Sequence, residues 1–142
     1  MTEDQIALIE ASFRLVAPIA EPAAGLFYQR LFELDPALRP LFAQTDLPAQ
    51  GRKLMTAIGF VVANLRRPEA MLPALRALGA RHGAYGVQPA HYVTVGAALL
   101  DTLGRGLGEA FTPAMHEAWA AAYGVVATTM IDAAAAEIRA AA

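Results

Sequence analysis

Cysteine is absent from this chain of 142 residues. Without thiols the chain cannot form disulfides, thiolate zinc sites or iron–sulfur clusters, and it cannot attach a c-type haem covalently. Any metal must therefore bind through histidine, through carboxylate or as part of a non-covalent cofactor. Histidine itself is scarce, with three residues in the whole chain.

Charge is also sparse. Charged residues make up 17% of the chain, the net charge is −2, and the pI is about 5.9. The basic residues are scattered along the sequence, with no cluster beyond Arg66 and Arg67. Nucleic-acid binding needs a concentrated basic footprint, so we expect no DNA or RNA partner.

Targeting and membrane signals are weak. Residues 1–5 show no basic region followed by an apolar run, so they do not read as a signal peptide. The apolar stretch 118–131 is too short to span a bilayer, and Tyr123, Thr128 and Thr129 interrupt it. We expect a cytoplasmic protein without a membrane partner.

Hydrophobic residues reach 56%, more than an ordinary domain of this length needs for its core. Part of the excess is alanine, a helix former. The rest includes several Phe, Leu and Ile residues between positions 27 and 60, which could line a pocket for a large apolar guest.

The sequence pattern is helical throughout, and no segment alternates with period two. Thr2 and Gln5 form a capping box for a first helix that ends near Ala17. Further helices are predicted over residues 21–34, 37–42, 49–65, 72–82 and 89–103, and from 113 onward. The glycines at 104–108 are expected to end the fifth of these. Six to eight helices of unequal length favour an all-α, orthogonal assembly in one domain, residues 1–142.

His82 ends an apolar helical stripe that includes Leu72, Leu75 and Leu78. An imidazole on such a face is most often a core side chain hydrogen-bonded to a carbonyl or a hydroxyl. The alternative is an axial ligand to a buried metal or haem. The stripe alone leaves both interpretations open.

Motifs spread over nearly the whole chain bear on that choice. They are Leu26-Phe27-Tyr28, Leu31-Phe32, Arg39-Pro40-Leu41-Phe42, Gln50-Gly51-Arg52-Lys53-Leu54-Met55, His82 with Gly86-Val87, His91-Tyr92, Val95-Gly96, and Trp119 with Ala122-Tyr123-Gly124. In this order and spacing the chain resembles a globin, and more specifically the bacterial single-domain globins related to the haem domain of flavohaemoglobins. The resemblance implies the globin fold, a three-over-three helical sandwich around a non-covalent haem b.

The resemblance also implies roles for individual residues. His82 matches the proximal ligand of the iron, and Tyr28 and Gln50 match the distal pair that donates hydrogen bonds to a bound gas. Tyr92 matches the tyrosine that orients the ligating imidazole. The other implied haem contacts are Phe42, Leu54, Ile58, Leu78, Val87 and Val95, with Lys53 and Arg81 pairing with the propionates. His91 is the only rival ligand.

Reversible dioxygen binding, for transport or storage, is the function that this resemblance implies. An alternative is enzymatic oxidation of nitric oxide with a separate reductase as partner, and others are haem-based gas or redox sensing and a haem-free helical interaction module. Flavohaemoglobin-type haem domains carry a proximal glutamate on the last helix, whereas Ala134 occupies that place here. A strong peroxidase-like electron push from the imidazole is therefore in doubt.

Overall fold

Helices account for all the regular structure of the computed structural model, which describes residues 1–141 and contains no strand in that range. The α-helices are α1 (Glu3–Val16), α2 (Ala20–Leu34), α3 (Leu47–Ala63), α4 (Pro68–Ala84), α5 (Pro89–Leu107) and α6 (Pro113–Ala141). Short 3-10 helices lie at η1 (Ala17–Ile19), η2 (Pro36–Phe42) and η3 (Gly108–Ala110). The prediction of an all-α assembly is confirmed.

Side-chain caps determine where several helices begin. The Gln5 amide N–H donates to Thr2 Oγ1 over 3.1 Å, and the Thr2 N–H donates to Gln5 Oε1 over 3.0 Å, so the predicted capping box is present. The Asp46 carboxylate accepts a bond from the Ala49 N–H over 3.3 Å. That cap starts α3 at Leu47, two residues before the position expected from the apolar pattern.

The end of α5 differs from the sequence prediction. The helix continues through Gly104 and Gly106 to Leu107, and it ends at Gly108, whose φ of +57° lies in the left-handed region. A glycine in a helix costs about 1 kcal/mol relative to alanine. The packing of α5 against α2, α6 and η3 offsets that cost, so only the glycine with positive φ stops the helix.

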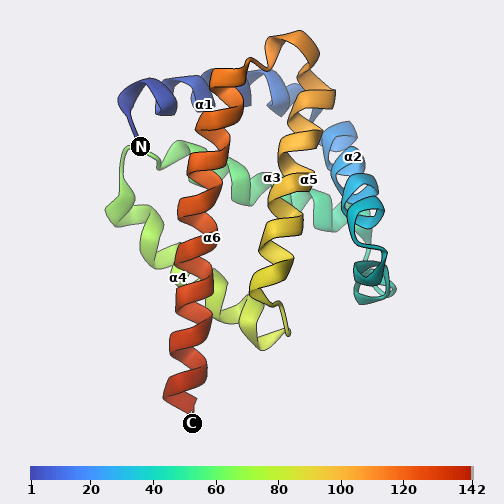
Figure 1. Ribbon diagram of the computed structural model, residues 1–142, viewed down its shortest axis with the longest axis vertical. Helices are drawn as coiled ribbons and strands as arrows, with labels where there is room; N and C mark the ends of the chain where they lie inside the picture. The colour runs from blue at the N-terminus through green and yellow to red at the C-terminus, as the bar shows by residue number, and fades with distance from the viewer. Residues whose placement is uncertain (142) are drawn as a thin grey trace.

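In Figure 1, α5 and α6 run side by side at the front, α3 crosses behind them, and α1 lies across one end. The α4 helix packs chiefly on α6, while α2 packs on both α5 and α3. Gly79 permits the close approach of α4 to α6, because a Cβ atom there would lie 2.5 Å from Met130 Cα. Within residues 1–141, α3 and α4 do not form an extensive interface with each other.

The core consists of three apolar clusters. The first joins α1, α3, α5 and α6 around Ile9, Leu103 and Trp119. The second joins α2, η2 and α5, and the third joins α4, α5 and α6. In the first cluster the Trp119 Nε1–H donates to Ser12 Oγ over 2.7 Å, so the one buried indole has its polar atom satisfied.

The helix α6 is longer than the apolar stretch that the sequence indicated. Its span Pro113–Ala140 has a mean hydropathy of 1.2, which meets a length and composition criterion for a membrane-spanning helix. Packed helices of globular domains meet the same criterion. Here α6 packs along α4, α1 and α5.

Candidate functional site

The His82 imidazole lies on α4 and is half-buried. Its Nδ1 atom is 2.8 Å from the carbonyl oxygen of Leu78, one turn earlier in the same helix. Because a carbonyl oxygen can only accept, the proton must sit on Nδ1, and this leaves the Nε2 lone pair free. A neutral imidazole with a free Nε2 and a bonded Nδ1–H is the form that ligates a metal.

In His91, the rival ligand, Nδ1 accepts a hydrogen bond instead of donating one. The Gln88 N–H donates to His91 Nδ1 over 2.9 Å, as part of a capping box at the start of α5. The neutral tautomer that accepts at Nδ1 carries its proton on Nε2, so this ring offers no lone pair to a metal. The third histidine, His116, is exposed near the start of α6. The geometry therefore favours His82 among the three.

Aromatic residues gather in a different apolar cluster from the one that contains the buried residues of α4. Tyr28 lies on α2, is 7% exposed, and packs its ring against Phe27 and Phe42, with ring centroids 5.1 Å and 5.9 Å apart. Leu54 of α3 and Val95 of α5 pack in the same apolar cluster. Burial raises the pKa of Tyr28 to about 12, so its hydroxyl keeps its proton at neutral pH and can donate a hydrogen bond.

Gln50 sits in the first turn of α3 and is half-buried. Its neighbour Gly51 brings α3 against α2, because a Cβ atom at position 51 would lie 2.8 Å from Ala24 Cβ and 3.9 Å from Tyr28 Cε2. Beside this contact runs an open groove of about 540 Å³ between the two helices, and Tyr28 forms part of its wall. The backbone thus brings the segments of the predicted distal pair close together, while no hydrogen bond joins their side chains within residues 1–141.

On the α4 side, Tyr92 and Tyr123 form a buried pair. The Tyr123 hydroxyl donates to the Tyr92 carbonyl oxygen over 2.6 Å, which ties α6 to the start of α5. The Tyr92 hydroxyl is buried without a hydrogen-bond partner in the described chain. Burial raises the pKa of both phenols. The structure orients His82 through the Leu78 carbonyl, and the orienting role of Tyr92 stays a prediction.

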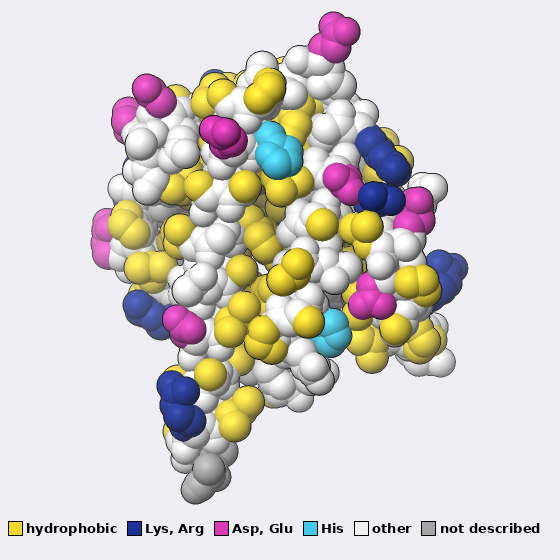
Figure 2. Space-filling view, viewed as in Figure 1, with side chains coloured by type: hydrophobic (Ala, Val, Ile, Leu, Met, Phe, Trp, Pro, Cys, Tyr) yellow, Lys and Arg dark blue, Asp and Glu magenta, His cyan; other side chains and the backbone are white. Residues whose placement is uncertain are grey.

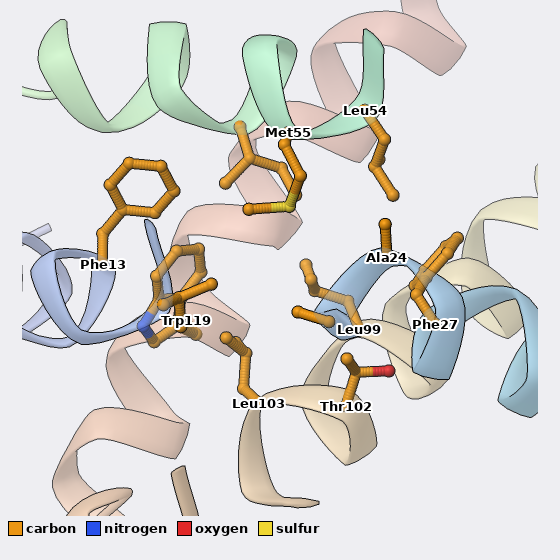
Figure 3. A pocket seen from close by; sticks show the side chains of 12 residues that line it. Phe13, Ala24, Phe27, Leu54, Met55, Leu99, Thr102, Leu103 and Trp119 are labelled. Carbon is orange, nitrogen blue, oxygen red and sulfur yellow. The ribbon is translucent and has the colours of Figure 1, made fainter. Parts of the chain in front are cut away.

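Leu54 packs in the cluster of Phe42 and Val95, whereas Ile58 packs in the cluster around Ile9, Leu103 and Trp119. Leu54 and Ile58 both line an internal cavity of about 20 Å³. Figure 3 shows Phe13, Phe27, Leu99, Leu103 and Trp119 around this cavity. The Thr102 hydroxyl at its wall is satisfied, since it donates to the Ala98 carbonyl over 2.7 Å. The cavity is large enough for one water, but its apolar walls offer too few polar partners to hold one, so it stays dry.

The remaining predicted residues fall into two groups. Leu78 and Val87 are half-buried and pack in the α4–α6 cluster with Tyr92, and the Val87 N–H donates to the His82 carbonyl over 3.1 Å. Lys53 and Arg81 are exposed on α3 and α4, and neither forms an ion pair within residues 1–141. Lys53 and Arg81 are therefore available to form ion pairs with an anionic group.

Two features of the site were not recognised from the sequence. The Leu78 carbonyl is the atom that orients His82, although Leu78 was expected only as an apolar contact; its spacing of four residues before the histidine was the available signal. Ala134 lies directly against Gly83, where a Cβ atom would come within 2.8 Å of the alanine methyl. The last helix therefore approaches the residue next to His82 through two small side chains.

Comparison with known proteins agrees with this geometry. Residues 25–130 match the family model described as Globin. The flavohemoproteins of Rhodopirellula baltica and Bacillus subtilis are each 32% identical to the chain, over 92% and 89% of it. The chain spans about a third of the length of these two relatives.

A solved structure, that of a bacterial globin from Campylobacter jejuni, superposes with a TM-score of 0.83 at 28% identity. The superposition covers 94% of this chain and 96% of that one. The fold and the sequence comparisons thus agree over almost the full length of the chain. The chain belongs to the globin family of haem-binding proteins.

Proposed function

We propose that this globin binds a non-covalent haem b through His82 and binds dioxygen reversibly on the side of Tyr28 and Gln50. The tautomer of His82 carries the proposal: its Nδ1–H is committed to the Leu78 carbonyl, so Nε2 is available for iron. His82 would hold the haem, and the bound haem would supply an iron that binds a small gas.

The residues present fit such a group. Apolar side chains of η2, α3, α4 and α5, including Phe42, Leu54, Leu78 and Val95, are half-buried in the described structure, as expected of residues that a large apolar cofactor would cover further. Lys53 and Arg81 are exposed and unpaired, which suits partners for two propionates.

The distal side chains supply hydrogen-bond donors. The Tyr28 hydroxyl and the Gln50 carboxamide each donate to a polar diatomic ligand, at about 1 kcal/mol net per bond. Dioxygen accepts such bonds better than carbon monoxide, so the pair favours dioxygen. With its pKa raised to about 12, Tyr28 remains a donor across the physiological range.

The first experiment is an absorption spectrum of the purified protein in the ferric, reduced and dioxygen-exposed states. His82→Ala is compared with His91→Ala, which removes the same type of side chain where Nδ1 accepts a hydrogen bond instead of donating one. We expect His91→Ala to keep the wild-type Soret band and His82→Ala to lose stable haem. Haem retained by His82→Ala with an unchanged spectrum would overturn the assignment.

A second candidate is oxidation of nitric oxide, which the similarity to flavohemoproteins favours. It needs an electron donor that returns the iron to the ferrous state, and the chain matches about a third of the length of those relatives. Ala134, which carries no carboxylate, lies against Gly83 next to His82, so we expect a weak electron push. Nitric oxide consumption measured with and without an added reductase distinguishes the two candidates.

A further inference from the structure

The charges of this chain are segregated along its elements, although they look scattered in the sequence. Residues 39–81 contain seven of the eleven basic residues and two of the thirteen acidic ones, a net charge of +5. The rest of the chain carries four basic and eleven acidic residues, a net charge of −7. All seven basic side chains of this segment are exposed: Arg39, Arg52, Lys53, Arg66, Arg67, Arg76 and Arg81.

The basic segment comprises η2, α3 and α4, and we call its exposed side the basic surface. These elements also carry Phe42, Gln50 and His82, so the basic residues lie on the same elements as the candidate haem site. Within residues 1–141 only Arg66 of the seven is ion-paired, with Glu3 and Glu10 of α1. The remaining six form no ion pair in the described part of the chain.

The other faces contrast with this surface. On the α5–α6 face in Figure 2, apolar and uncharged surface predominates, and the basic side chains lie at its margins. The basic residues of α2 and α5 are already engaged, because Arg30 and Arg105 face Asp101 and Glu33 across 2.8 Å and 4.0 Å. Outside residues 39–81, the basic residues without an ion pair in the described chain are Arg14 and Arg139, so most of the unpaired positive charge lies on the haem-site elements.

We infer that the basic surface docks an acidic electron-donating protein that carries a flavin or an iron–sulfur cluster. The inference rests on the proposed function, because a haem iron oxidised in use must regain one electron. In that step one electron passes from the reduced cofactor of the partner to ferric iron, which becomes ferrous while the partner is oxidised by one electron. Electrons enter haem most readily at its edge, and the charged elements are those that hold it.

An acidic protein fits better than a nucleic acid or an anionic membrane. The chain as a whole is acidic, with a net charge of −2, so an extended polyanion would meet repulsion beyond the basic surface. A compact partner protein with one acidic patch would contact only the basic surface, whose residues 39–81 carry a net charge of +5. Such complementarity acts mainly on association rate, which steering raises by about 10-fold or more at low salt.

The test uses two double variants with the same change in net charge. Arg67→Glu with Arg76→Glu reverses two exposed, unpaired charges of the basic surface and leaves Lys53 and Arg81 in place. Arg14→Glu with Arg139→Glu reverses two exposed charges on α1 and α6. Arg76 lies six residues before His82, about 9 Å along the helix axis.

The probe is a plant-type [2Fe–2S] ferredoxin, an acidic carrier. We measure its rate of reducing the ferric protein at about 20 and 300 mM salt, and the affinity of its oxidised form by calorimetry. We expect the rate to fall about 10-fold with salt and severalfold in the basic-surface variant, and the affinity to fall with it. The α1–α6 variant should behave like wild type in both measurements. Reduction by neutral lumiflavin semiquinone should be equal in all three proteins.

Salt-independent reduction, or an equal loss in both double variants, would overturn this inference while leaving haem binding intact. Tight binding to anionic vesicles or nucleic acid, without binding to ferredoxin, would overturn it in favour of another polyanion. A protein that takes up no haem would overturn the proposed function itself. The absorption spectrum recorded before each run separates these cases.

Discussion

Replacing Gly79 by alanine tests the contact on which the position of α4 depends. An added Cβ atom would lie 2.5 Å from Met130 Cα and 2.8 Å from Met130 C, and closer still to the carbonyl oxygen. Ordinary contact begins near 3.4 Å, so α4 and α6 must separate by about 1 Å. These are backbone atoms, which cannot rotate away as a flexible side chain can.

Overpacking of this kind costs about 1–3 kcal/mol, even though alanine gains up to about 1 kcal/mol in helix propensity. Gly124→Ala is the matched control, because no atom lies within 4 Å of a Cβ at that position of α6. We expect it to stabilise the protein by up to about 1 kcal/mol, so the two variants should differ by about 2–4 kcal/mol.

Urea unfolding of the haem-free protein, followed by circular dichroism, measures this difference. At a slope of about 1–2 kcal/mol per M, it shifts the unfolding midpoint by at least about 1 M. Since His82 follows Gly79 by three residues, Gly79→Ala should also release haem faster to an apoglobin acceptor. Equal midpoints for the two variants would refute the role given to this contact.

Two further predictions concern buried polar side chains. Trp119→Phe removes the 2.7 Å bond to Ser12 and should destabilise the protein by about 1–3 kcal/mol in urea unfolding; in a Ser12→Ala background the same change should cost about 1 kcal/mol less, and equal costs would contradict the bond. Burial raises the pKa of Tyr28 from 10.0 to about 12, so the folded protein keeps this proton where the unfolded chain loses it. Stability should be unaffected below pH 10 and should fall between pH 10 and 12 by up to about 1.4 kcal/mol per pH unit for this group, and Tyr28→Phe should make that decline shallower.

Local signals in the sequence predicted much of the helical framework. The Thr2–Gln5 capping box and the prolines at 89 and 113 mark helix starts that the structure confirms. Such signals work because they act on backbone groups only a few residues away. The end of α5 was predicted too early because tertiary packing carried the helix through Gly104, which no local rule reports.

The candidate site was predictable only in part. The apolar stripe placed His82 on the inner face of α4. The tautomer that leaves Nε2 free could be inferred only from the structure, which shows the Leu78 carbonyl next to Nδ1. Ile58 lies one turn after Leu54, and helical spacing could not show that it packs with α1 and α6 instead of with Phe42. The basic surface was missed because its charges are spread thinly over residues 39–81, and only the bounds of η2, α3 and α4 relate them to the elements that carry Phe42, Gln50 and His82.

The bond between His82 and Leu78 has a consequence for how this protein tolerates mutation. The atom that holds the imidazole belongs to the main chain, so substitutions at position 78 change the packing around the histidine without deleting its partner. If a neighbouring side chain oriented the histidine instead, a substitution of that residue would remove the hydrogen bond. Here the helix backbone fixes the orientation of the imidazole. Only a substitution that breaks α4 near this turn, such as a proline, would remove it.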